Sequence, residues 1–384
     1  MGARGPGRRA GSKAGSGVDA RLGRRKTEHC RPHDGREMSN VDRRSFLGTM
    51  AAAVGAISLG VTGRGDPRSS TMELGSATTP GHASARTSFG SLKHIDAGVL
   101  NVAYAETGPA HGPAVILMHG WPYDIHSYTD VAPLLAAEGY RVIVPYLRGY
   151  GATRFLSGDT FRNGQQAVVA TDIIALMDAL GIDKAILGGF DWGARTGDII
   201  AALWPERCKA LVAVSGYLIT DRREQRLPLP PAGELGWWYQ YYFSTERGVL
   251  GYSEHTHDFN KLIWKIVSPK WNFDDATFDR TAASFDNPDH VKIVIHNYRW
   301  RLGLVDGESK YDHLESRLEK SPVIDVPTIT IASDFDGAAA NGSAYRKLFS
   351  GRYAHRILKG IGHNVPAEAP KAFADAVVEV DHWR

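Results

Sequence analysis

The chain has 384 residues, 43% of them hydrophobic, which fits one large domain with an insertion or two small domains. The formal net charge of +3 is unevenly distributed, because residues 1–44 hold 12 Lys and Arg against 5 Asp and Glu, whereas the remainder holds 33 against 37. The positive excess therefore belongs to the N-terminal leader. The rest of the chain lacks the basic excess that nucleic-acid binding requires, so we expect no nucleic-acid partner.

The leader is similar to a twin-arginine export signal. Arg43 and Arg44 precede an uncharged run, residues 48–63, that is rich in Ala and Gly. A membrane anchor is the alternative, but this run is shorter than the roughly 20 apolar residues that span a bilayer. We therefore expect export to the periplasm or beyond, without stable membrane insertion afterwards. The predicted segments are a spurious or disordered extension at 1–37, the signal at 38–63 and a linker at 64–86.

From residue 87 onward, apolar runs alternate with amphipathic segments. Residues 98–105 alternate in the way of an edge strand, and continuous apolar runs at 114–118 and 184–188 indicate buried parallel strands. This order predicts an α/β fold with a mainly parallel sheet flanked by helices. The other predicted strands are 141–145, 210–214, 327–331 and 356–358, and the predicted helices are 164–180, 194–203 and 366–380.

The pattern changes at residue 217, where apolar strands give way to aromatic helical segments. We interpret residues 217–322 as a helical cap inserted into a core formed by 87–216 and 323–384. The predicted cap helices are 234–246, 256–267, 274–284 and 289–302.

The chain has two cysteines, Cys30 and Cys208. Cys30 would leave with the leader, so no intramolecular disulfide and no cysteine pair for a metal would remain. We expect Cys208 to be a small core residue, and we expect neither a metal nor a cofactor. The oligomeric state stays open, and a homo-oligomer is compatible with the sequence.

The central motif is Gly-Phe-Asp-Trp-Gly at residues 189–193, between a predicted strand and a predicted helix. This is the shape of a nucleophile elbow, in which a tight turn presents one side chain above a parallel sheet. Here that side chain is Asp191, which is ionised at neutral pH and needs no base to attack carbon. Such an attack forms an ester of the enzyme, which water must then cleave. The alternative interpretation of Asp191 is a structural helix N-cap.

Two further residues follow later strands, at the sheet edge where active sites of open α/β folds collect. His363 follows the last predicted strand and Asp336 follows the one before it. The order Asp191, Asp336, His363 is that of α/β-hydrolase triads. We expect His363 to remove a proton from water and Asp336 to stabilise the imidazolium, with Asp334 as the rival acid.

Ester hydrolysis places negative charge on a carbonyl oxygen, and backbone N–H groups stabilise such charge. We expect the N–H groups of Trp121 and Trp192 to form this oxyanion hole. Trp121 lies in the loop His119-Gly120-Trp121-Pro122, which would line the site, and both tryptophans could also be hydrophobic lining.

From about residue 95 onward the chain resembles the epoxide hydrolases of the α/β-hydrolase superfamily. The resemblance implies that Tyr239 and Tyr298, in the cap, donate protons to the epoxide oxygen as the ring opens. The motifs that carry it are His119-Gly120-Trp121-Pro122, Arg148-Gly149-Tyr150-Gly151, Asp191-Trp192-Gly193, Gly362-His363, Tyr239-Gln240-Tyr241-Tyr242-Phe243 and Asn297-Tyr298-Arg299.

The sequence therefore predicts hydrolysis of a small apolar or aromatic epoxide, with water as the second reactant. A haloalkane dehalogenase is the nearest alternative, because it uses the same aspartate ester and Trp192 could donate to a halide. A non-catalytic binding protein is the second alternative, although a receptor has no need of Asp191, Asp336 and His363 together. A serine esterase is disfavoured because the elbow holds no serine.

Overall fold

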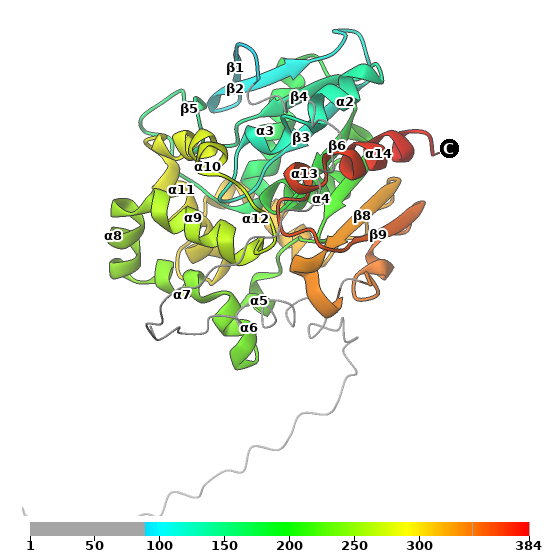
Figure 1. The fold of residues 1–384 in the computed structure, drawn as a ribbon. Coiled ribbons are helices and arrows are strands. Elements are labelled where there is room, and N and C mark those ends of the chain that lie inside the picture. The colour runs from blue at the N-terminus through cyan, green and yellow to red at the C-terminus, as the bar shows by residue number, and fades with distance from the viewer. Residues whose placement is uncertain (1–88, 340, 384) are drawn as a thin grey trace, which may run out of the picture. The chain divides into compact units, whose positions relative to one another are not determined.

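The computed structural model describes residues 89–339 and 341–383. These residues contain a nine-stranded sheet (Figure 1). The predicted export signal lies outside these residues. The strand order is β1-β2-β4-β3-β6-β7-β8-β9, and β5 pairs with β2. The strands are β1 (Lys93–Ala97), β2 (Leu100–Thr107), β3 (Ala114–Met118), β4 (Arg141–Pro145), β5 (Arg154–Phe155), β6 (Ala185–Gly189), β7 (Cys208–Val214), β8 (Thr328–Ser333) and β9 (Tyr353–Leu358).

The sheet is parallel from β4 through β3, β6, β7 and β8 to β9, and antiparallel where β2 pairs with β1, β4 and β5. This is the α/β-hydrolase arrangement that the sequence predicts. The prediction of an edge strand at 98–105 is wrong, because β1 pairs along the outer side of β2 and forms the edge itself. The strands β3 and β6 lie inside the sheet, as their continuous apolar sequences predict.

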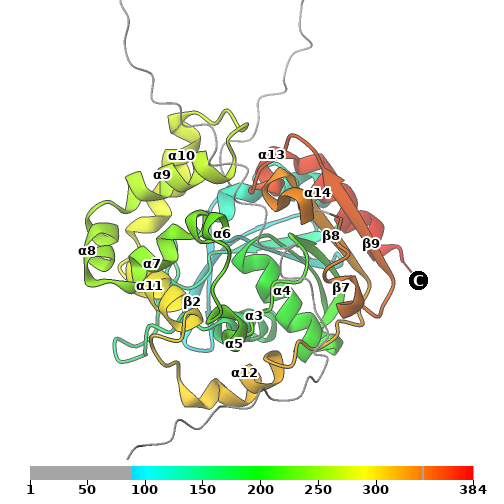
Figure 2. The same ribbon diagram turned by 90° about the horizontal axis from the view of Figure 1, so that it is seen from below.

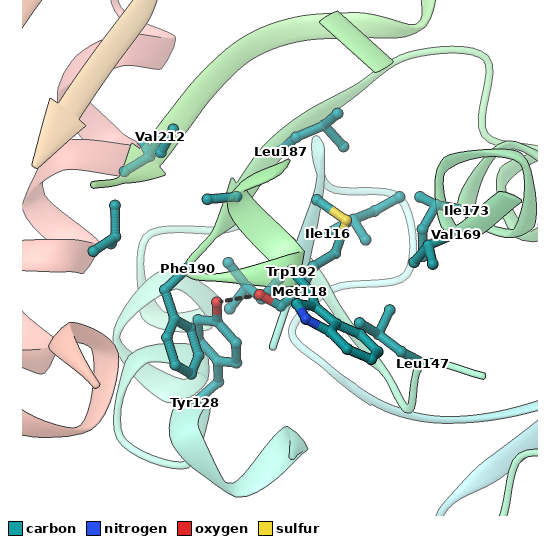
Figure 3. Packing of buried hydrophobic residues seen from close by; sticks show 14 of the residues in the cluster. Ile116, Met118, Tyr128, Leu147, Val169, Ile173, Leu187, Phe190, Trp192 and Val212 are labelled. Carbon is teal, nitrogen blue, oxygen red and sulfur yellow. Dashed lines mark hydrogen bonds between the residues drawn. The ribbon is translucent and has the colours of Figure 1, made fainter. Parts of the chain in front are cut away.

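Helices cover both faces of the sheet. On one face α2 packs against α14, and on the other α3 packs against α4. Figure 3 shows the core between them, where Ile116, Leu187 and Val212 from three neighbouring strands lie among larger side chains. The core helices are η3 (Ile125–Tyr128), α2 (Val131–Ala137), α3 (Gln166–Ala179), α4 (Trp192–Leu203), η4 (Pro205–Arg207), η7 (Asp334–Ala339), η8 (Arg346–Leu348), α13 (Val365–Glu368) and α14 (Pro370–Asp381).

The chain between β7 and β8 forms helices, apart from an isolated β-bridge at Ile324 (Figures 1 and 2). In both views α7, α8, α9 and α11 gather on one side of the sheet. These elements fall within the predicted cap, residues 217–322. They are α5 (Arg222–Gln225), α6 (Pro231–Gly236), α7 (Trp238–Ser244), α8 (Glu246–Glu254), α9 (Thr256–Val267), α10 (Asp275–Ala282), η5 (Ala283–Asp286), α11 (His290–Arg301), η6 (Ser309–Tyr311) and α12 (Asp312–Leu318).

Two expectations about single features can be compared with this fold. Cys208 is fully buried at the start of β7, as expected for a core residue. Within the described ranges, no helix combines the length and the apolar character that crossing a membrane requires.

Candidate active site

Asp191 occupies a strained backbone conformation at the bend between β6 and α4. Its φ of 51° and ψ of −122° fall in a region that residues with a side chain rarely adopt. Asp191 stands at the N-cap position of α4, but its side chain makes no capping hydrogen bond. The carboxylate is therefore not a structural cap of this helix, and the alternative interpretation of the motif is wrong.

The two glycines of the motif permit this bend. A Cβ atom at Gly189 would lie 2.4 Å from the carbonyl carbon of Gly193, and one at Gly193 would lie 1.9 Å from the Met118 carbonyl oxygen. These distances leave no room for a side chain, because the start of α4 crosses directly over β6 and the end of β3. The Gly-x-Asp-x-Gly spacing is thus a requirement of local backbone packing.

The residues on either side of Asp191 anchor it in the core. Phe190 is fully buried and Trp192 is 2% exposed. In Figure 3 the two rings lie in the core on either side of the bend, Phe190 beside Tyr128. The Tyr128 hydroxyl donates to the Met118 carbonyl oxygen at 2.8 Å, which ties η3 to the end of β3. Two anchored neighbours hold the side chain of Asp191 in one place.

The loop after β3 supplies a backbone donor to Asp191. The Trp121 N–H donates to Asp191 Oδ1 at 2.8 Å. Gly120 makes this approach possible, since a Cβ atom there would lie 2.3 Å from the Asp191 Cβ. Trp192 is the first residue of α4, and the N–H groups of a first helical turn have no acceptor within the helix. Both predicted oxyanion donors therefore belong to segments that border this carboxylate.

His119 has a supporting role in the same loop. It is fully buried, and its Nε2 accepts a hydrogen bond from the Leu147 N–H at 3.1 Å while its Nδ1 lies 3.1 Å from the Gly120 carbonyl oxygen. Burial lowers the pKa of His119 to about 4, so the ring is neutral at physiological pH. A neutral ring that donates from Nδ1 and accepts at Nε2 satisfies both contacts. The carbonyl oxygen of Pro122 accepts from the Trp264 indole at 2.8 Å and joins the loop to α9.

His363 lies opposite the second oxygen of the aspartate, with 3.7 Å between its Nε2 and Asp191 Oδ2. Its backbone N–H donates to the Ser268 hydroxyl and to the Val267 carbonyl oxygen, at the end of α9. The Phe335 ring packs on the imidazole with 4.2 Å between centroids. Among the described residues, no hydrogen-bond partner reaches the buried His363 Nδ1.

The two candidate acids differ in their surroundings. The Asp334 carboxylate forms an ion pair with Lys270 at 2.6 Å and is 37% exposed, so it is engaged at the surface. The Asp336 carboxylate accepts from the Ser333 N–H at 2.7 Å. Burial raises the pKa of Asp336, while the Ser333 N–H and the nearby His363 oppose that rise. Asp336 is thus the better placed acid, although no hydrogen bond joins it to His363 Nδ1 in this structure, and its role in stabilising the imidazolium stays a prediction.

The surroundings of Asp191 favour its ionised form. Burial alone would raise its pKa, but His363, the guanidinium of Arg195 and the Trp121 N–H outweigh this effect and lower the pKa of Asp191. The carboxylate is therefore charged at neutral pH, as a nucleophile that acts without a base must be.

The two predicted phenols lie together in the cap. Tyr239 in α7 and Tyr298 in α11 have ring centroids 5.4 Å apart, and both pack against the Trp121 ring, at 5.0 and 5.3 Å. Burial raises the pKa of each phenol, and the negative charge of Asp191 raises both further. Both therefore remain protonated hydrogen-bond donors.

A cavity of about 220 Å³ adjoins these groups. Of the residues predicted from sequence, Asp191 and Tyr298 line it. Tyr239 does not line the cavity, but its ring packs against the ring of Tyr298, which does. The remaining lining mixes apolar with polar and charged residues and comes from the start of the cap, from α5, α6, α7 and α11, and from the region of η8. Its apolar part includes Leu218, Ile219, Leu227, Leu229, Trp237, Leu302 and Leu348.

Two arginines of the lining were missed by the sequence interpretation. Arg195 stands four residues after Asp191 on α4, and Arg301 stands three residues after Tyr298 on α11. Residues three or four apart share one face of a helix. This spacing was available in the sequence and could have drawn attention to both residues. In residues 89–339 and 341–383, no group of three or more His, Cys, Asp and Glu side chains could hold a metal ion.

Comparisons with known proteins agree with this geometry. A family model described as the alpha/beta hydrolase fold matches residues 113–259. The crystal structure of a protein from Klebsiella pneumoniae, proposed there to be an epoxide hydrolase, is similar over 78% of this chain and 100% of its own, with 56% identity and a TM-score of 0.76.

Two curated relatives come from Mycobacterium tuberculosis. Epoxide hydrolase B is 32% identical over 162 residues, which are 38% of this chain and 45% of the relative, so that match spans less than half of the relative's length. Epoxide hydrolase A is 24% identical over 319 residues, which are 74% of this chain and 95% of the relative.

Proposed function

Because the chain belongs to the epoxide hydrolases of the α/β-hydrolase superfamily, we propose that it hydrolyses an epoxide to a vicinal diol through an ester on Asp191. One observation carries the proposal: the two carboxylate oxygens of Asp191 have different partners. Oδ1 accepts from the Trp121 N–H, Oδ2 lies 3.7 Å from His363 Nε2, and Asp191 lines the cavity.

In the first step Oδ2 attacks a ring carbon of the epoxide. A bond forms between Oδ2 and carbon, the carbon–oxygen bond of the ring breaks, and the epoxide oxygen becomes an alkoxide that needs a proton. Tyr298 lines the cavity and the Tyr239 ring packs against the Tyr298 ring, so these phenols are the candidate donors. Both phenols are neutral because burial and Asp191 raise their pKa values.

In the second step water cleaves the ester at the Cγ atom of Asp191. His363 takes a proton from the water, and the charge of Asp336 stabilises the resulting imidazolium. Oδ1 carries the developing negative charge, and the N–H groups of Trp121 and Trp192 stabilise it. When the tetrahedral intermediate collapses, the bond from Cγ to the substrate oxygen breaks, that oxygen takes the remaining proton of the added water and the diol leaves. The proton on His363 returns to the phenolate, and one oxygen of the regenerated carboxylate has come from water.

A halide leaving group would require different donors. The Trp121 indole N–H donates to the Tyr252 hydroxyl at 2.9 Å and is therefore occupied. The Trp192 indole nitrogen is buried, and Trp192 is not among the residues that line the cavity. The phenol of Tyr298, by contrast, belongs to the lining. The positions of the Trp121 and Trp192 indoles thus disfavour them as a pair of halide donors, which leaves the Trp237 indole as the candidate halide donor of the lining.

The two-step scheme is tested with the His363→Gln variant, which should open the ring and then accumulate the ester. The measurement is the mass of the peptide that contains Asp191 after incubation with styrene oxide. A matching experiment uses the unaltered protein for a single turnover in ¹⁸O-water, where the same peptide should gain one heavy oxygen. Diol formation without either mass change would exclude an ester on Asp191.

A further inference from the structure

Two guanidinium groups line the cavity without a carboxylate partner. Arg195 is 6% exposed, yet its side chain forms no hydrogen bond or ion pair with any described residue. Arg301 makes one long hydrogen bond within the described chain, 3.4 Å to Gln225 Oε1, and its Nε is buried without a partner. Buried arginines are normally paired, so the buried Arg195 beside the partly buried Arg301 is unusual.

The acidic residues nearby are engaged elsewhere. Asp221, which also lines the cavity, is held by Arg223 through contacts of 3.1 and 2.9 Å. The buried carboxylate of Glu315 accepts from Gln166 and from the Ala167 N–H. The contacts of Asp221 and Glu315 involve neither of the two arginines, and Glu224 of the lining has an interaction of its own.

The two cations also act on each other. Burial and the positive charge of Arg301 lower the pKa of Arg195 to about 10. Asp191, Tyr298 and Glu315 oppose this effect from a distance, while the two oxygens of Asp191 face the Trp121 N–H and His363. Removing a guanidinium from water without a counter-charge is costly, and two neighbouring guanidinium groups increase that cost. An anion bound between the two guanidinium groups would offset both the cost of burial and their mutual repulsion.

We propose that the substrate is a small epoxide that carries a carboxylate, and that Arg195 and Arg301 bind this carboxylate. The inference rests on the proposed epoxide hydrolysis for the identity of the reactive group. Arginine is suited to this role, because its planar N–H groups match the two oxygens of a carboxylate. The sequence predicts an apolar substrate. The two arginines of the lining indicate instead a substrate that has both an apolar part and a carboxylate.

The positions of the arginines limit the distance between the carboxylate and the epoxide. Arg195 stands one helical turn from the nucleophile and Arg301 one turn from the phenol of Tyr298. A carboxylate between them would hold the ring near both reacting groups. The volume of about 220 Å³ is below the roughly 300–1,000 Å³ of pockets for drug-sized ligands, which indicates a short molecule.

The test compares acids with uncharged amides of the same carbon skeleton. The probes are glycidate, 3,4-epoxybutanoate and 4,5-epoxypentanoate, each beside its primary amide. For at least one pair, kcat/KM should be tenfold or more higher for the acid. The Arg301→Gln variant should lower kcat/KM for that acid at least tenfold more than for the amide, chiefly through KM, and Arg301→Lys should keep part of the preference. Arg226→Gln, which removes an exposed charge outside the lining, is the matched control.

Three outcomes would overturn the inference. The amides could equal or exceed the acids. The Arg301→Gln variant could lower turnover of acid and amide equally, which would mean that Arg301 acts on the Tyr298 phenol. The control Arg226→Gln could have the same effect as Arg301→Gln.

A binding measurement separates this inference from the proposed function. Calorimetry with the Asp191→Asn variant should detect the preferred epoxy acid and not its amide, and the additional Arg301→Gln change should abolish that binding. If styrene oxide is hydrolysed but no acid binds, this inference fails alone. If the acid binds but no epoxide yields a diol or an ester on Asp191, the proposed function fails while the anion site stands.

Discussion

The loops of the core and the helices of the cap hold their functional groups in different ways. Residues 119–122 and 189–193 are positioned by backbone contacts so close that a Cβ atom at Gly120, Gly189 or Gly193 would collide with its surroundings. The phenols of Tyr239 and Tyr298 are positioned by aromatic rings, which pack around the Trp121 ring at centroid distances of 5.0 and 5.3 Å.

This difference has a consequence for catalysis. The core groups must align one carboxylate with an N–H donor and an imidazole, and backbone contacts leave them little freedom. The cap groups must give a proton to an oxygen whose position depends on the substrate, and packed rings preserve their place when a hydroxyl is removed. Substitutions of the phenols in the cap should therefore change the reaction rate without changing stability. Substitutions in the core loops should change both.

The largest effect is expected for Asp191→Asn, which removes the nucleophile. Turnover of styrene oxide should fall by about 10⁴-fold or more, since no other group can form the ester. Diol formation is measured by chromatography. The matched control is Asp334→Asn, which breaks the surface ion pair with Lys270 and should keep near-normal turnover. A comparable loss in that control would indicate that Asp334, and not Asp336, supports the histidine.

The next effect concerns the close approach of the loop to the nucleophile. In Gly120→Ala the new Cβ would lie 2.3 Å from the Asp191 Cβ, so the loop must shift and the Trp121 N–H must lose its alignment. We expect kcat to fall by roughly 10²-fold. Steady-state kinetics and thermal unfolding are measured together.

The control for this substitution is Gly158→Ala. A Cβ atom at Gly158 meets no atom within 4 Å, so neither activity nor melting temperature should change. Full activity in Gly120→Ala would show that the close contact is not needed for alignment.

In the cap, the double variant Tyr239→Phe with Tyr298→Phe should lower the rate of ring opening by about 10²–10⁴-fold, because no proton donor then faces the alkoxide. The rings remain, so the melting temperature should stay within a few degrees of that of the unaltered protein. Single-turnover kinetics of ester formation measure the effect. Tyr242→Phe on the same helix, outside the cavity lining, serves as the control. Unchanged ring opening in the double variant would favour dehalogenation and direct attention to halide release assays.

The smallest effect concerns the attachment of the cap to the core. Glu315 in α12 accepts hydrogen bonds from Gln166 and Ala167 in α3, and burial raises its pKa to about 7. A carboxyl group whose pKa is raised on folding stabilises the protein at low pH and loses that contribution as the pH rises through about 7.

The free energy of unfolding of the unaltered protein should therefore fall, relative to Glu315→Gln, by about 2 kcal/mol between pH 5 and pH 8. Urea unfolding at both pH values measures this difference. Glu246→Gln, at a residue whose side chain is 91% exposed, should show no such dependence. A constant difference between Glu315→Gln and the unaltered protein would mean that Glu315 is ionised throughout this range.

Much of the fold was predictable because its signals are local in the sequence. Continuous apolar runs identified β3 and β6, and the glycines around Asp191 identified the bend between β6 and α4. The hairpin partner β1 was missed, because Lys93–Ala97 is largely exposed and lacks an apolar run. Its pairing with β2 gives it a strand conformation that its own composition does not indicate.

The sequence alone determined where the nucleophile stands and which loop approaches it, because backbone sterics within a few residues decide both. The tertiary structure decided which distant side chains share the cavity. Arg195 in α4 and Arg301 in α11 are separated by more than 100 residues. Only the tertiary structure shows that both line one cavity and that neither has a carboxylate partner there. The tertiary structure also decided the partner of Asp334, because its carboxylate forms a surface ion pair with Lys270 of the cap. Pairing and burial of charge depend on the surroundings of a side chain, and those surroundings are formed by segments that no local pattern connects.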